Sequence, residues 1–233
     1  MKILSILFIF LNMLFAQDFY AVVKPVETYN IKSSVSGSVV KVYQNLEATK
    51  VLEHTIVQLD NSIDKIDLKE SKLKLQNLKE VLKLEQDTLN SFNKVSSKSK
   101  IDKNNQKIKV LNISSSVSDL ITKIATLEDK IAKKTIKVHN LYISNIAVKK
   151  GDWVNMGSLL FTADDISKYK IDIFIPIDMD IKDKIIYIDD KKTDLKISKL
   201  WKIADTTNLS SYKCEIILDT KYQLSKVVKV TFR

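Results

Sequence analysis

The chain has 233 residues, of which 45% are hydrophobic and 28% are charged, a composition typical of a folded globular protein rather than a disordered one. It contains three glycines, Gly37, Gly151 and Gly157, so neither a GxGxxG nor a GxxxxGK[ST] phosphate-binding loop can be formed. The formal net charge is +10, but 37 of the 38 basic residues are lysine, interleaved with Asp and Glu. Because proteins that read nucleic acids favour arginine, we interpret the charge as a solvated lysine-rich surface and expect no nucleic-acid partner.

Residues 1–16 have the pattern of a secretory signal peptide. Lys2 supplies the basic start, residues 3–15 are almost wholly apolar, and Ala16 precedes the polar Gln17. The apolar run is shorter than the roughly 20 residues that span a bilayer. The sequence therefore predicts an exported protein that is cleaved after Ala16, with retention of the segment as an anchor as the alternative.

Residues 17–60 are expected to form an N-terminal strand region and the first half of a β-domain. The stretch 29–43 is rich in β-branched residues and turns at 36–37, which predicts two short strands. Another strand is predicted at 55–59. The run Asp60–Ser62 consists of residue types that cap helix N-termini, so a helix is expected to follow.

Residues 61–134 carry an apolar repeat of seven residues, without Gly or Pro, that predicts two long helices. Leucine occupies one position of every heptad in the first arm, and the companion position is half apolar: Leu68, Leu75, Leu82 and Leu89, with Ser71, Leu78, Glu85 and Phe92. Seven successive seam positions are apolar in the second arm: Val110, Ile113, Val117, Leu120, Ile124, Leu127 and Ile131. Ser and Asn are concentrated at 93–105, where we place a turn. Two such seams joined by a polar turn predict an antiparallel coiled-coil hairpin.

Residues 135–165 return to strand patterns and contain a turn at Gly151–Asp152, and the segment closes at Asp164–Asp165, two residues interpreted as turn or cap residues. Residues 166–233 contain several short strand candidates at regular spacing, which predicts a small β-barrel or sandwich. These candidates are 169–179, 185–188, 195–201, 212–218 and 227–232. The fold class expected from the whole pattern is α+β.

Two motifs and their order give the sequence a family resemblance. Gly-Asp-x-Val-x-x-Gly-x-x-Leu occupies Gly151–Leu160, Ser-x-Ser-Gly-x-Val occupies Ser34–Val39, and the helical region lies between them. Ile173–Pro176 is similar to the start of a barrel domain. With these features the chain resembles the periplasmic adaptor subunits, or membrane fusion proteins of the HlyD-like family, that serve tripartite efflux and secretion systems.

The resemblance implies a specific domain order. A lipoyl-like β-domain would be split into halves at 17–60 and 135–165 by an α-helical coiled-coil hairpin at 61–134, and a β-barrel would occupy 166–233. Gly37, Gly151, Asp152 and Gly157 would form the structural turns of the two halves. No lipoyl cofactor is implied, because the helical insertion takes the place between the halves where carrier proteins hold a modified lysine.

The resemblance also implies a function and a location. The protein would be located in the periplasm, peripheral to the inner membrane, and would support transmembrane export. It would bridge an inner-membrane transporter of the RND or ABC type and a TolC-like outer-membrane channel, as a homo-oligomer. The alternative that we keep open is an exported coiled-coil scaffold or binding protein that is not tied to a transporter.

The tip of the predicted hairpin is the candidate partner-binding site. Relatives that dock on TolC-like channels often carry Arg, Leu and Ser at a fixed spacing; here Leu89 and Ser96 fit that spacing, but Glu85 stands in place of the Arg. The candidate contact residues are Leu89, Val95, Ser96, Lys98 and Asp102.

The sequence shows no constellation typical of an enzyme, and we expect no catalytic, metal or cofactor site. His54 and His139 lack a cluster of Cys, Asp or Glu at ligand spacing. A GxSxG nucleophile elbow is absent from the sequence. Cys214, the single cysteine, lies in a strand-like run and is interpreted as a small buried apolar residue.

Overall fold

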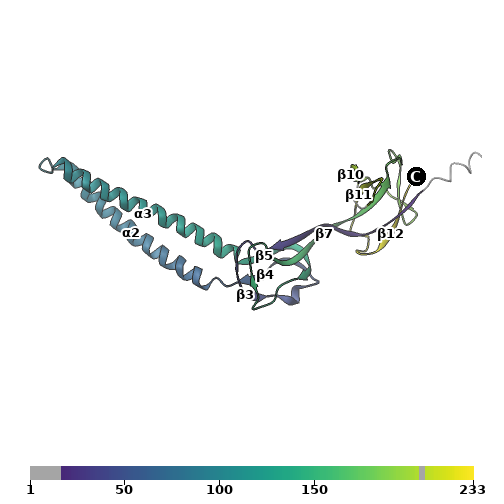
Figure 1. Cartoon of the computed structure of the whole chain (residues 1–233), viewed down its shortest axis with the longest axis horizontal. Coiled ribbons are helices and arrows are strands. Elements are labelled where there is room, and N and C mark those ends of the chain that lie inside the picture. The colour runs from purple at the N-terminus through teal and green to yellow at the C-terminus, as the bar shows by residue number, and fades with distance from the viewer. Residues whose placement is uncertain (1–16, 205–207) are drawn as a thin grey trace, which may run out of the picture.

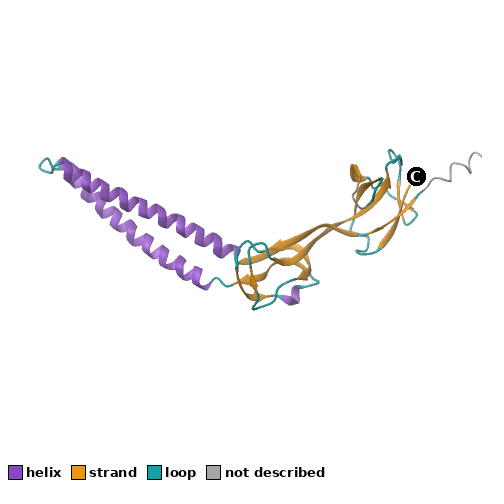
Figure 2. Ribbon diagram, viewed as in Figure 1, coloured by secondary structure: helices purple, strands orange, loops and turns teal. Residues whose placement is uncertain are grey.

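The computed structural model describes residues 17–204 and 208–233, so the expected signal segment lies outside the described residues. The molecule is elongated: two long helices form one end, a β-unit lies in the middle, and a second β-unit forms the other end (Figure 1). The elements in chain order are β1 (Asp18–Val22), β2 (Lys24–Lys32), β3 (Gly37–Val42), η1 (Gln44–Leu46), β4 (Lys50–Leu59), α2 (Ser62–Lys94), α3 (Lys100–Lys133), β5 (Thr135–Ile146), β6 (Trp153–Val154), β7 (Leu159–Pro176), β8 (Ile186–Ile188), β9 (Lys191–Lys192), β10 (Ile197–Ala204), β11 (Ser211–Leu218) and β12 (Val227–Phe232). The expected α+β class is confirmed, with a sheet-rich part and two long helices (Figure 2).

Two separate hydrophobic cores define the two β-units. The core of the central β-unit is formed by β3 to β6 and the first part of β7, and includes Val39, Ile56, Val57, Leu59, Ile143, Leu160 and Phe161. The core of the terminal β-unit is formed by β1, β8, β11, β12 and the second part of β7, and includes Val23, Ile171, Ile173, Ile175, Cys214, Ile216 and Phe232. Two cores instead of one explain the extended shape, since each unit buries its apolar face independently.

The long strand β7 joins the two units. Its 18 residues pass from the central core, at Phe161, into the terminal core, at Ile171. β2 pairs antiparallel with β7 from Lys24 opposite Lys170 to Lys32 opposite Leu159. The connection between the units is therefore a two-stranded ribbon and not a single loose chain.

The continuity of β7 corrects two expectations. The boundary expected between 165 and 166 falls inside one strand, and Asp164 and Asp165 are strand residues rather than turn residues. The physical reason is a partner on the neighbouring strand: the Thr28 hydroxyl of β2 donates a hydrogen bond of 2.6 Å to the Asp164 carboxylate. A carboxylate in a half-buried strand is tolerated when it is hydrogen-bonded in this way.

The first strand of the chain belongs to the terminal unit. β1 pairs antiparallel with β12, with Asp18 opposite Thr231, and Ala21 and Val23 lie in the terminal core. The range 17–60, expected as one N-terminal region, is thus divided, because β1 completes the terminal sheet before β2 carries the chain to the central unit. A pairing between residues more than two hundred positions apart leaves no local signal in the sequence.

The two helices, which we call the helix pair, pack through the expected seam. The predicted seam position Ser71 is buried. The less exposed apolar positions are Leu68, Leu75, Leu78, Leu82, Leu89 and Phe92 on α2 and Val110, Ile113, Val117, Leu120, Ile124, Leu127 and Ile131 on α3. Ion pairs join Lys72 to Glu128 and Glu85 to Lys109. Because the start of α2 thereby contacts the end of α3, and the end of α2 the start of α3, the two helices are antiparallel.

The turn between the helices is shorter than the expected 93–105. α2 continues to Lys94 and α3 begins at Lys100. Ser99 and Asp102 form a capping box in which the Ser99 hydroxyl accepts from the Asp102 amide at 3.1 Å and the Asp102 carboxylate accepts from the Ser99 amide at 3.3 Å. This cap satisfies amide donors at the helix N-terminus, so the polar run that follows it is helical.

Candidate functional site

The tip of the helix pair presents a short exposed turn. Val95, Ser96 and Lys98 lie in this turn and are exposed to solvent. The Lys98 ammonium lies 4.4 Å from the centre of the Phe92 ring, a distance at which a cation–π contact is favourable. The tip therefore combines an apolar side chain, a hydroxyl and a positive charge.

The other two predicted tip residues have structural surroundings. Leu89 is half-buried in the seam of the helix pair, one turn below the tip. Asp102 is engaged in the capping box with Ser99, so its carboxylate orients the start of α3. Ile101, which the sequence analysis did not select, is 71% exposed beside the turn. Its signal in the sequence is an apolar residue outside the heptad seam.

Glu85, which stands where relatives often carry Arg, is held by α3. Its carboxylate accepts a hydrogen bond of 2.7 Å from the Gln106 side chain and pairs with the Lys109 ammonium at 2.5 Å. The hydrogen bond from Lys109, followed by the one from Gln106, lowers the pKa of Glu85. The side chain at this seam position thus connects the two helices and is not directed to a partner.

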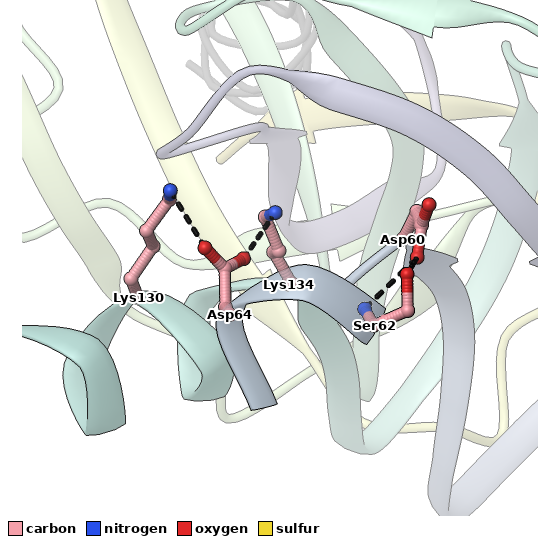
Figure 3. Close-up of polar contacts among 5 residues, drawn as sticks. All are labelled: Asp60, Ser62, Asp64, Lys130 and Lys134. Carbon is pink, nitrogen blue, oxygen red and sulfur yellow. Dashed lines mark hydrogen bonds and ion pairs between the residues drawn. The ribbon is translucent and has the colours of Figure 1, made fainter. Parts of the chain in front are cut away.

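The base of the helix pair contains a buried cluster of charges, shown in Figure 3. Asp64, in the first turn of α2, pairs with Lys130 at 2.8 Å and with Lys134 at 2.5 Å. The side chains of Asp64 and Lys134 are 7% and 10% exposed. The Lys134 carbonyl accepts a hydrogen bond of 2.8 Å from the Leu59 amide, at the end of β4. The cluster therefore joins both helices where they meet the central β-unit.

The charges at the base also match the polarity of both helices. A carboxylate in the first turn of α2 and ammonium groups at the end of α3 oppose the respective helix dipoles favourably. Hydrogen bonds from Lys130 and then Lys134 lower the pKa of Asp64. Next to it, Asp60 accepts from the Ser62 amide at 3.0 Å and from the Ser62 hydroxyl at 2.7 Å (Figure 3). The Asp64 cluster is not predicted from the sequence, where its signal is an acidic first turn on one arm and a basic last turn on the other.

The predicted turn residues of the central unit occupy different conformations. Gly151 and Gly157 have φ angles of +98° and +87°, a region that favours glycine. The Asp152 carboxylate accepts from the Lys149 amide at 2.8 Å and closes the first of these turns. Gly37, by contrast, lies in β3, where an added Cβ would lie 3.6 Å from the Cβ of Leu59. Gly37 therefore has no positive φ angle that requires glycine, and an added Cβ would make an ordinary contact with Leu59.

The described residues show no arrangement suited to metal or thiol chemistry. No group of three or more His, Cys, Asp or Glu side chains is close enough to hold a metal ion within residues 17–204 and 208–233. His54 and His139 are exposed. Burial raises the pKa of Cys214 to about 12, so its thiol is protonated at neutral pH. None of the helices in the described part of the chain has the length and hydropathy required to cross a membrane.

Several solved structures have a similar architecture. The structure is similar to that of MacA from Actinobacillus actinomycetemcomitans, with a TM-score of 0.74 and 16% identity over 94% of this chain and 78% of that one. It is similar to a MacA–MexA chimera that contains the Pseudomonas aeruginosa MexA α-hairpin, with a TM-score of 0.69 and 15% identity over 94% and 81% of the two chains. It is also similar to the membrane fusion protein Spr0693 from Streptococcus pneumoniae R6, with a TM-score of 0.72 and 10% identity over 93% and 98% of the two chains.

No protein-family model matches the sequence, and no curated protein matches it. These solved structures share the fold of the chain over nearly its full length despite low identity. The resemblance carried by the sequence motifs agrees with the structural neighbours. The chain has the fold of membrane fusion proteins.

Proposed function

We propose that the protein is a periplasmic adaptor that bridges an inner-membrane efflux transporter, of the RND or ABC type, and a TolC-like outer-membrane channel. The observation that carries this proposal is the placement of an exposed tip at the far end of a helix pair whose base is closed by ion pairs between the two helices and continues into the central β-unit. α3 has 34 residues, so at 1.5 Å per residue the pair extends the tip by about 50 Å. In this proposal the protein couples two partners and carries out no chemical reaction.

The tip residues Val95, Ser96 and Lys98 are the surface proposed to contact the channel, supported by Leu89 and Asp102 beneath them. Their exposure leaves them available to a partner, while the capping box and the Phe92–Lys98 contact order the turn. The acidic Glu85 is neutralised by Lys109, so the tip relies on apolar and hydroxyl groups and the Lys98 charge, and not on an arginine.

Site-specific photo-crosslinking in cells that express the full chain tests this function. A photoreactive residue at position 96 is expected to capture an outer-membrane channel protein, whereas one at the exposed Asp119, midway along α3, should not. Equal capture from both positions, or no channel capture from position 96, would contradict the bridging role. The second result, together with unimpaired export of efflux substrates in a deletion strain, would favour the scaffold alternative.

We also propose that the adaptor is a homo-oligomer that associates through α2. Five exposed apolar residues lie outside the seam of that helix: Ile63, Ile66, Leu73, Val81 and Leu84, each 42% to 72% exposed. At 100° per residue they fall within an arc of about 80°. Within this arc the stripe is interrupted by the exposed Glu70 and Asn77, so five of its seven positions are apolar. A mostly apolar stripe on a helix that is exposed in the single chain indicates burial against another protein surface.

Sedimentation of the full chain tests the oligomer. Leu73→Lys is expected to weaken self-association, since it places a charge in the apolar stripe. Gln76→Lys is the matched control, because Gln76 is exposed on another face of the same helix. A wild-type chain that remains monomeric at high concentration, or two variants with the same sedimentation behaviour, would refute the role of the stripe.

A further inference from the structure

The terminal β-unit contains a large open cavity that the adaptor role does not use. Its volume is about 960 Å³, within the range of small-molecule sites. It lies between the end of β7, the segment 177–185, β8, β9 and β10.

The floor of the cavity is apolar. It includes Ile175, Met179, Ile181, Ile186, Leu195, Ile197 and Leu200. Ile175 and Ile186 are almost completely buried, and the other five pack against the terminal core while keeping part of their surface exposed. A concave apolar surface that stays partly open to water gains free energy when an apolar ligand covers it.

The rim of the cavity is basic. Five lysines line it, Lys182, Lys184, Lys192, Lys196 and Lys202, together with three aspartates, Asp180, Asp183 and Asp194. Five positive and three negative groups give the rim a net charge of +2. In the described part of the chain none of these lysines forms an ion pair, whereas many lysines elsewhere do. Their ammonium groups are therefore available to an external anion.

We propose that this cavity binds an amphipathic anion, with an acyl chain on the apolar floor and a carboxylate or phosphate head against the lysine rim. The floor alone would accept a neutral apolar molecule, but the unpaired lysines favour a ligand that brings negative charge to the rim. A free fatty acid and an anionic membrane lipid share this chemistry. The site belongs to the terminal β-unit and requires neither transporter nor channel, so it stands or fails independently of the proposed bridging function.

Calorimetric titration of the full chain with laurate, below its micelle concentration, tests the site. Laurate is expected to bind, whereas dodecyl maltoside, with the same chain length and a neutral head, and acetate, with the charge alone, should bind much more weakly. Anionic phosphatidylglycerol vesicles form the second arm: binding to vesicles without binding to laurate assigns the ligand to the membrane, and binding to laurate alone assigns it to free fatty acids. No binding in either arm, or equal binding of laurate and dodecyl maltoside, would overturn the proposal.

Two pairs of lysine substitutions locate the site. The double variant Lys184→Gln, Lys196→Gln is expected to weaken binding roughly five- to tenfold, which corresponds to two weak charge contacts. The double variant Lys149→Gln, Lys150→Gln removes the same charge from the central β-unit and should leave binding unchanged. Ile181→Asp, which places a carboxylate on the floor, should abolish binding while the urea midpoint shows that the chain remains folded. Equal affinities for the two double variants would contradict a site at this rim.

Discussion

Asp64 and Lys134 form a buried ion pair, with 2.5 Å between Oδ2 and Nζ, that closes the base of the helix pair against the central β-unit. Lys130 completes the arrangement from one turn earlier in α3. Asp64 is near the start of α2 and Lys134 caps the end of α3. The ion pair therefore requires the antiparallel arrangement that brings these two helix ends together. The contact therefore joins the start of α2 to the end of α3 at the point where both helices meet the central β-unit.

The first prediction concerns the loss of this carboxylate. Asp64→Asn leaves the ammonium of Lys134 without its charged partner in a site where that side chain is 10% exposed. Removing one member of a buried pair is strongly destabilising, so we expect the free energy of unfolding to fall by about 3 kcal/mol. Urea unfolding measures the change. Asp67→Asn, an exposed position on the same helix, is the control and should change stability little.

The second prediction is the pH dependence of the same contact. The pKa of Asp64 is lowered from 3.8, so its carboxylate contributes stability above the unfolded pKa and loses that contribution as pH falls through the folded value. The stability difference between wild type and Asp64→Asn should be constant near neutral pH and should shrink below about pH 4. Urea midpoints across this range measure it. A difference that stays constant down to pH 2 would show that the charge on Asp64 is not the source of the stability.

The third prediction concerns the contacts of Glu85 with α3, below the tip of the helix pair. Glu85→Arg places a positive charge beside Lys109, and it removes the carboxylate acceptor of the Gln106 side chain while the backbone carbonyl of residue 85 remains an acceptor. We expect faster amide hydrogen exchange in the last turns of α2 and the first turns of α3. Adding Lys109→Glu should restore protection by reversing the pair. If the double variant exchanges as fast as the single variant, the interaction is not electrostatic.

The fourth prediction compares the effect of alanine at glycines with positive φ angles and at a glycine without one. Gly151→Ala and Gly157→Ala introduce a Cβ at φ angles of +98° and +87° and should each cost about 1–2 kcal/mol of stability. Gly37→Ala is the matched comparison, because its added Cβ meets Leu59 at ordinary contact distance. Thermal or urea unfolding ranks the three variants. A Gly37 variant as unstable as the other two would contradict this assignment.

The fifth prediction concerns Cys214. Its burial and a pKa of about 12 predict that a thiol reagent labels the folded chain at pH 8 only as fast as the terminal unit opens. Denaturant should accelerate labelling in parallel with unfolding. Ser96→Cys in a Cys214→Ala background places a thiol at the exposed tip and should react immediately. Rapid labelling of native Cys214 would show that the terminal core is open.

The helices and several strands are predictable from the sequence because their signal is a local periodicity. The heptad positions from Leu68 to Ile131 are the seam of the helix pair, since a helix repeats its buried face within a few residues of any position. The same kind of local signal predicts a strand at 227–232, which agrees with β12. The predicted turn is too long because Ser and Asn are common in loops, whereas here Ser99 serves as a helix cap.

The tertiary structure decided the features that depend on distant residues. The pairing of Asp18 with Thr231, the passage of β7 through two cores, and the meeting of Asp64 with Lys134 each join segments that have no local pattern in common. The cavity in the terminal unit is of the same kind, because its apolar floor and basic rim come from several separate segments. The sequence by itself determined the two long helices, their seam and most of the strand segments, since propensity and periodicity act over neighbouring residues. Only the tertiary structure determined which surfaces those elements share, since burial and charge pairing depend on contacts between residues that are far apart in the chain.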